Sequence, residues 1–180
     1  MRSTIRRLLP VVALLLGACR ADPSADAAPV TTSDAVPPPP AKVAAATTTG
    51  ETWNAAQIDW QPYEAGLAKA KAENKPVCLI FYTGWCPHCK TYSRVFDDPK
   101  VVARSRNFVM IRLNADDEGD LARRFAKDGT YIPRTFFLGA DGTPDYGIHA
   151  QRDKFAYFYD EHNPAAILAG MDEAERKLRN

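Results

Sequence analysis

The sequence predicts an α/β fold with a central mixed β-sheet flanked by helices. Three short, continuous apolar segments, at 77–82, 108–113 and 134–138, are typical of buried strands. Helix-forming segments lie between and after these strands, so the two kinds of element alternate along the chain. An order of this kind implies a sheet that carries helices on both faces.

The expected helices have recognisable end signals. We expect helices at 63–73, 86–96, 98–105, 118–127 and 163–178. Two of them begin with an N-cap residue followed by proline, Asp98-Pro99 and Asn163-Pro164, which suits the first helical position. The last helix has an apolar face made by Ile167, Leu168, Met171, Ala174 and Leu178. A turn at 139–142 follows the third strand, and a hairpin strand should follow that turn.

The folded domain is expected to span residues 53–180. Residues 20–52 contain 23 Ala, Pro, Thr and Ser among 33 positions, and no Leu, Ile, Met or aromatic residue. Such a segment buries too little apolar surface to offset the entropy of ordering it. All three Trp, all seven Tyr and all eight Phe lie at or beyond Trp53. We therefore expect residues 19–52 to be a disordered tether.

The charge balance argues against nucleic acid as a partner. From Trp53 onward the chain has 18 Lys and Arg against 18 Asp and Glu, which gives a net charge of zero. A protein that binds the phosphate backbone needs an excess of positive charge on one face. No segment of the sequence is long and apolar enough to span a bilayer.

Residues 1–18 have the pattern of a bacterial export signal. Three arginines, Arg2, Arg6 and Arg7, precede an apolar run of eleven residues, Leu8–Ala18, which is too short for a membrane span. The run ends in Leu16-Gly17-Ala18-Cys19, which resembles a lipobox, and Cys19 would then be the lipidated residue. Such a protein would be lipid-anchored to the inner or outer membrane and would face the periplasm. The alternative is an ordinary signal peptide cleaved near Ala18 or Ala21.

The segment Trp85-Cys86-Pro87-His88-Cys89-Lys90 carries the predicted chemistry, because it follows a strand and opens a helix. Zinc sites also use Cys-x-x-Cys, but they usually need a second pair of ligands, and none stands at metal spacing here. A static structural disulfide is the other alternative. The strand, the turn and the export signal together favour a redox-active disulfide, Cys86–Cys89, with no further cofactor and no metal.

The positions of the two cysteines predict their roles. Cys86 lies at the N-terminus of the expected helix, where unpaired N–H groups and the helix dipole stabilise an anion. We expect Cys86 to be an exposed thiolate that attacks disulfides, and Cys89, one turn further, to be a buried resolving thiol. Cys78, in the strand, is expected to be a small buried apolar residue, and a third exchanging thiol is the alternative.

Four neighbours are expected to modulate the pair: Trp85, Pro87, His88 and Lys90. Trp85 can shield the site, and Pro87 removes a backbone donor and stiffens the turn. His88 can add a positive charge or a hydrogen bond near Cys86, or can be an exposed spacer. Lys90 is one candidate for accepting a proton from the resolving thiol.

Ile132 and Pro133 are expected to bind the substrate chain. The Ile-Pro pair directly precedes the third strand, which makes it a candidate for a cis peptide bond, with an ordinary trans turn as the alternative. A cis proline beside the cysteine pair would turn the preceding backbone groups outward, where they can pair with a polypeptide. The aromatic segment 155–159 could line a peptide groove or pack a loop on the core.

These motifs together resemble the thioredoxin superfamily. The Trp-Cys-x-x-Cys-Lys motif and the Ile-Pro pair are spaced as in that family, and the resemblance covers about residues 58–180. The segments 107–110, 131–134, 136–142 and 157–159 and the final helix resemble the endoplasmic-reticulum thioredoxin-like group that includes the anterior gradient proteins. The Pro-His dipeptide between the cysteines resembles DsbA-type periplasmic oxidases.

The resemblance implies a thioredoxin-like fold, Cys86 and Cys89 as redox residues, a cis Pro133, and protein thiols as substrates. One position departs from the pattern, because many thioredoxins have a buried carboxylate six residues before the first cysteine and this chain has Ile80. We expect a thiol–disulfide oxidoreductase with an oxidising or isomerising bias, whose partners are exported proteins, a redox partner protein and the membrane. The rival functions are a Cu(I) chaperone or a client-holding chaperone that binds through the cysteine pair.

Overall fold

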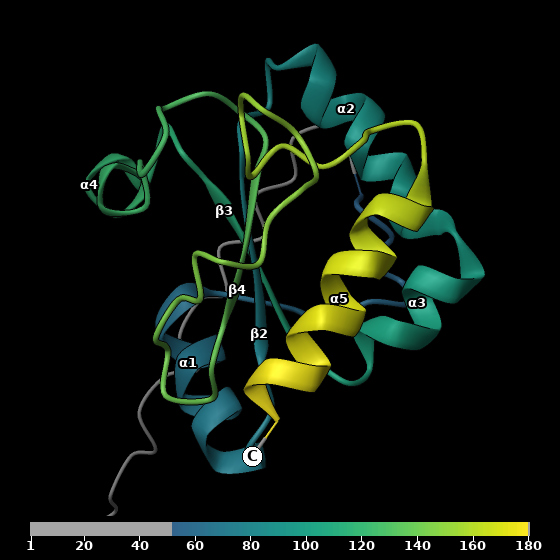
Figure 1. The fold of residues 1–180 in the computed structure, drawn as a ribbon, viewed down its shortest axis with the longest axis vertical. Coiled ribbons are helices and arrows are strands. Elements are labelled where there is room, and N and C mark those ends of the chain that lie inside the picture. Colours follow the sequence, from purple (N-terminus) through teal and green to yellow (C-terminus); the bar gives the residue numbers. More distant parts are fainter. Residues whose placement is uncertain (1–51, 180) are drawn as a thin grey trace, which may run out of the picture. The chain divides into compact units, whose positions relative to one another are not determined.

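Four strands form a mixed sheet in the order β1-β3-β2-β4 in the computed structural model, which describes residues 52–179 (Figure 1). The strands are β1 (Trp60–Gln61), β2 (Val77–Tyr82), β3 (Val109–Asn114) and β4 (Arg134–Leu138). β3 pairs in parallel with both β1 and β2, and β4 pairs antiparallel with β2. The predicted α/β class and the mixed sheet are therefore confirmed.

Helices cover both faces of the sheet. They are α1 (Tyr63–Glu73), α2 (Pro87–Ser93), α3 (Pro99–Ser105), α4 (Gly119–Arg124) and α5 (Pro164–Leu178). Alternate residues of β2 point to opposite faces. Val77, Leu79 and Phe81 belong to the core cluster that includes residues of α1 and α4. Cys78 and Ile80 belong to the cluster that includes residues of α2, α3 and α5, so the redox motif lies on that face.

The helix ends follow the predicted caps. Asp98 accepts hydrogen bonds from the backbone N–H groups of Lys100 and Val101, at 2.8 and 3.3 Å, and Asn163 accepts one from Ala165 at 3.0 Å. The helix expected at 86–96 is divided, because α2 ends at Ser93 and a 3-10 turn follows at Arg94–Asp97.

Three elements differ from the sequence-based expectation. The strand expected after the turn at 139–142 is reduced to a single antiparallel bridge between Leu138 and Pro144, because proline has no N–H to continue the ladder. The helix expected at 118–127 is shorter, since α4 ends at Arg124. The two-residue strand β1 was not predicted, because two residues carry no periodic signal.

Trp53 packs at the start of the described domain. Its side chain is 1% exposed, and its ring lies edge-on to Tyr92 of α2, with centroids 5.8 Å apart. Among residues 52–179 no helix has the length and apolar character needed to cross a membrane. The expected signal peptide, Cys19 and almost all of the expected tether lie outside the described residues.

Candidate active site

Cys86 is the N-cap residue of α2, so the fold places its sulfur at the helix start. Its backbone is extended, and its Sγ accepts a hydrogen bond from the N–H of Cys89 at 3.4 Å. Pro87 occupies the first helical position, where a missing N–H costs no hydrogen bond. The sulfur thus takes the place of the oxygen that usually caps a helix.

The two cysteines are both buried. Cys89 is 0% exposed, as expected for a resolving thiol, but Cys86 is 4% exposed, so the expectation of an exposed attacking thiol is wrong for this structure. The loop before β4 contacts the sulfur, because Cys86 Sγ lies 3.8 Å from the carbonyl oxygen of Ile132.

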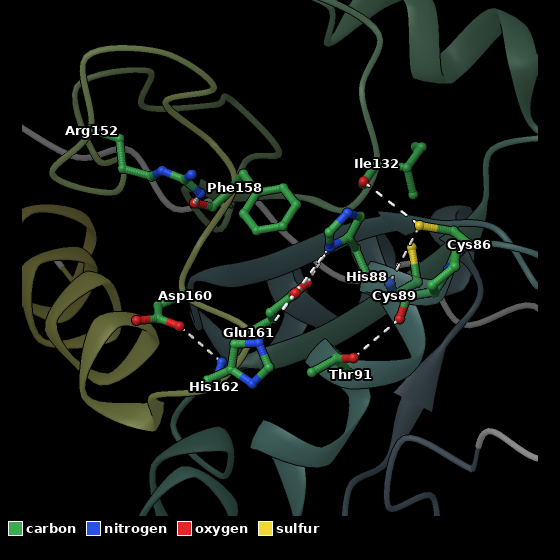
Figure 2. A network of polar contacts seen from close by, with 11 residues as sticks. Cys86, His88, Cys89, Thr91, Ile132, Arg152, Phe158, Asp160, Glu161 and His162 are labelled. Atoms are coloured by element: carbon green, nitrogen blue, oxygen red, sulfur yellow. Dashed lines mark hydrogen bonds and ion pairs between the residues drawn. The ribbon is translucent and has the colours of Figure 1, made fainter.

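The peptide bond between Ile132 and Pro133 is cis, as the sequence indicated. Ile132 is partly exposed and Pro133 is buried. Figure 2 shows the carbonyl of Ile132 directed toward the sulfur of Cys86. The structure therefore brings Ile132 to the Cys86–Cys89 pair, although Ile132 is 46 positions from Cys86 in the sequence.

Arg134 fixes the loop that carries Ile132, and sequence reasoning missed it. Its guanidinium is buried and donates hydrogen bonds to the carbonyls of Ala122, Phe125 and Gly129, at 3.0, 3.1 and 3.1 Å. Burial lowers the pKa of this guanidinium. These bonds tie β4 to the end of α4, where unpaired carbonyls need donors. An arginine within an apolar segment gave no sign of this role.

His88 is paired with an acidic residue that sequence reasoning also missed. Its Nδ1 lies 2.9 and 3.0 Å from the two carboxylate oxygens of Glu161, and its ring packs edge-on against Phe158 at a centroid distance of 5.7 Å (Figure 2). Among the described contacts, the hydrogen-bond partner of His88 is Glu161 and not Cys86. Among residues 52–179 the hydrogen bond of His88 thus goes to Glu161, and the expected positive charge near Cys86 and its alternative, an exposed spacer, stay predictions.

Trp85 stands beside the cysteine pair with most of its surface exposed, at 68%. Its indole N–H donates to a carboxylate oxygen of Asp116 at 2.8 Å, which fixes the ring. Phe155 is the other large apolar side chain that is exposed in the described domain, at 50%, and it packs against Tyr131, the residue before Ile132. Both exposed rings thus belong to segments that adjoin the site. Lys90 is exposed.

The interior beneath the cysteine pair lacks a carboxylate at the Ile80 position. Ile80 is fully buried and lies in register with Arg112 of β3 and Thr135 of β4. Cys78 is also fully buried, and burial raises the pKa of its thiol. Cys78 therefore fits the expected small apolar residue. Within residues 52–179 no group of three or more His, Cys, Asp or Glu side chains is arranged to hold a metal ion.

The sequence of this chain matches a known protein family and several known proteins. Residues 59–140 match the family described as thioredoxin-like. Anterior gradient protein 2-B of Xenopus laevis is 33% identical over 119 residues, which cover 65% of this chain and 71% of that protein. The chain therefore belongs to the thioredoxin-like family and is a distant homologue of the anterior gradient proteins.

Two solved structures share the fold. A thioredoxin from Thermus thermophilus superposes with a TM-score of 0.52 at 24% identity, over 65% of this chain and 86% of that chain. A structure titled DsbH Oxidoreductase superposes with a TM-score of 0.51 at 17% identity, over 67% of this chain and 85% of that chain. At these identities the likeness concerns the fold alone.

Proposed function

We propose that this protein is a thiol–disulfide oxidoreductase that exchanges disulfides with polypeptide substrates through Cys86. The observation that carries the proposal is the position of the Cys86 sulfur, which caps α2 and faces the Ile132 carbonyl. A helix N-cap favours the thiolate, which is the nucleophile in disulfide exchange. The partly exposed Ile132 lies beside this sulfur, where an extended substrate chain can pass, and the solved structure of the DsbH oxidoreductase shares the fold.

The exchange proceeds through a mixed disulfide. The Cys86 thiolate attacks one sulfur of a substrate disulfide, a Cys86–substrate bond forms, and the second substrate sulfur leaves as a thiolate. The Cys89 thiolate then attacks Cys86, which releases the first substrate sulfur and leaves a Cys86–Cys89 disulfide. The protein is oxidised by two electrons and the substrate is reduced by two. The reverse sequence oxidises a substrate dithiol.

The wider setting of the proposal is the periplasm. A lipid on Cys19 would anchor the domain to a membrane, exported proteins would be the substrates, and a redox partner protein would regenerate the pair. The motif at 16–19 and the composition of 20–52 support this setting. Mass spectrometry of the mature N-terminus tests it, with Cys19→Ala as the control. A diacylated Cys19 is expected, and an unmodified Cys19 would contradict the anchor.

Turnover assays test the oxidoreductase itself. Wild type should catalyse insulin reduction or the refolding of a reduced disulfide protein, and Cys86→Ser should lose that activity. Unchanged activity in Cys86→Ser would contradict the assignment.

An anaerobic Cu(I) titration tests the rival function, a copper chaperone. A tight stoichiometric copper site that is lost in Cys86→Ser, in a protein without exchange activity, would favour that function.

A further inference from the structure

We propose that Glu161 is a positioning residue for the redox site, which holds His88 by its Nδ1 atom and limits how strongly the Cys86 thiolate is stabilised. The proposal rests on the proposed function. It starts from the 2.9 and 3.0 Å distances between His88 Nδ1 and both oxygens of Glu161, a residue 73 positions away. Within residues 52–179, Glu161 is the acidic residue whose contact with His88 the structure shows.

The pairing is held from both sides. The Glu161 side chain is 13% exposed, whereas the His88 side chain is 62% exposed, so the carboxylate is the more fixed partner. Phe158 packs edge-on against the His88 ring, and Arg152 lies over the ring of Phe158 with its Cζ 4.8 Å from the centroid. His162 Nε2 lies 3.5 Å from the same carboxylate. Glu161 and Phe158, in the segment before α5, thus orient the side chain of His88 in α2.

The contact determines which nitrogen of His88 carries hydrogen. A carboxylate accepts hydrogen bonds, so the Nδ1 that faces it must donate, and Nδ1–H is the tautomer that the pair selects in the neutral ring. The other nitrogen, Nε2, is then the proton acceptor. His88 is in this way restrained by Glu161 rather than by the sulfur two residues before it.

The charges predict the direction of the effect. With Glu161 ionised, the pair carries a net charge of zero when His88 is protonated and minus one when it is neutral. When His88 is protonated, loss of the carboxylate leaves the imidazolium without its counter-charge, so the surroundings of Cys86 become more positive through His88. A more positive surrounding stabilises the thiolate, favours the dithiol and makes the disulfide a stronger oxidant. Glu161 therefore weakens the oxidising power that a protonated His88 without a counter-charge would confer.

The main experiment compares Glu161→Gln with wild type in equilibrium with glutathione. The reaction is protein dithiol plus GSSG giving protein disulfide plus two GSH, which balances two electrons and two protons. Glu161→Gln should lower the equilibrium constant about fivefold, the effect of one unit charge near the sulfur. Asp160→Asn is the charge-matched control, because Asp160 is the exposed neighbour that accepts from the N–H of His162 and does not contact His88. Asp160→Asn should shift the constant less than about twofold.

Two further measurements separate the outcomes. Long-range ¹H–¹⁵N spectra report the tautomer of His88 without any substrate, and should show Nδ1–H in wild type and more Nε2–H in Glu161→Gln. In a His88→Ala background, Glu161→Gln should lose most of its effect on the equilibrium constant. The proposal is overturned if the tautomer and the constant do not change, if Asp160→Asn shifts the constant as much, or if the full shift survives without His88. An absence of disulfide exchange in wild type would instead refute the proposed function, and the tautomer would still test the pairing.

Discussion

The carbonyl oxygen of Ile132 lies 3.8 Å from the sulfur of Cys86, although the two residues are 46 positions apart in the chain. This contact joins the start of α2 to the loop before β4. Cys86 itself is only 4% exposed. The loop that carries Ile132 is held by Arg134, which donates hydrogen bonds to three backbone carbonyls.

Arg134→Met should destabilise the domain by about 2–4 kcal/mol, because it leaves the carbonyls of Ala122, Phe125 and Gly129 without their donor. Urea unfolding followed by circular dichroism measures the change. Arg152→Met is the matched control, since Arg152 is exposed and donates to a single carbonyl, that of Phe158. The control should cost less than about 0.5 kcal/mol. Equal losses in the two variants would show that Arg134 does not hold the loop.

Gly170→Ala should also destabilise, although alanine is the better helix former. A Cβ at Gly170 would lie 2.7 Å from the hydroxyl of Tyr159 and 2.9 Å from the Phe137 ring, so α5 would have to move away from β4. We expect a net loss of about 1–3 kcal/mol in the free energy of unfolding. Gly119→Ala is the control, because its nearest neighbour is the flexible end of Arg123 at 3.4 Å. A gain in stability from Gly170→Ala would mean that α5 is not packed this closely.

The free energy of unfolding should fall as the pH rises above about 8.5, in part because of Cys78. Burial raises the pKa of this thiol in the folded state, so the unfolded chain loses a proton that the folded chain keeps. The stabilisation is complete below the unfolded pKa and declines above it, by at most about 1.4 kcal/mol per pH unit. Above about pH 10 the buried Tyr92 and Tyr159 should add to the decline, because burial raises their pKa as well.

Denaturant unfolding of wild type and Cys78→Ala at several pH values between 7 and 10 measures this contribution. Cys78→Ala should show a shallower decline than wild type above pH 8.5. Parallel curves for the two proteins would mean that Cys78 ionises in the folded state as readily as in the unfolded chain.

Trp85→Ala and Phe155→Ala should raise KM for a protein substrate by roughly fivefold each, the effect of truncating a contact residue. The two rings are the large apolar side chains that the described domain exposes, and both adjoin the segments that carry Cys86 and Ile132. Oxidation by GSSG, which is too small to span the surface, should stay within about twofold of wild type. An unchanged KM would show that substrates do not lie across these rings.

Much of the site could be predicted from the sequence because its signals are local. The apolar strand, the cysteine spacing and the Ile-Pro pair each lie within a few residues, and the structure places Cys86, Cys89 and Pro133 on the expected elements. Glu161 and Arg134 escaped notice because their partners lie on other elements, and only the fold brings them together. The burial of Cys86 was missed for the same reason, since the loop that contacts it comes from another part of the chain.

The most direct test of the account is the trapping of a mixed disulfide. Cys89→Ser and Cys86→Ser are each incubated with an oxidised protein substrate, quenched with acid and analysed by mass spectrometry. Cys89→Ser should accumulate a covalent adduct that maps to Cys86 and dissolves in dithiothreitol, because no resolving thiol is left to release it. Cys86→Ser should form none. An adduct on Cys89 in the Cys86→Ser protein, or none in Cys89→Ser, would contradict the assignment of Cys86 as the attacking sulfur.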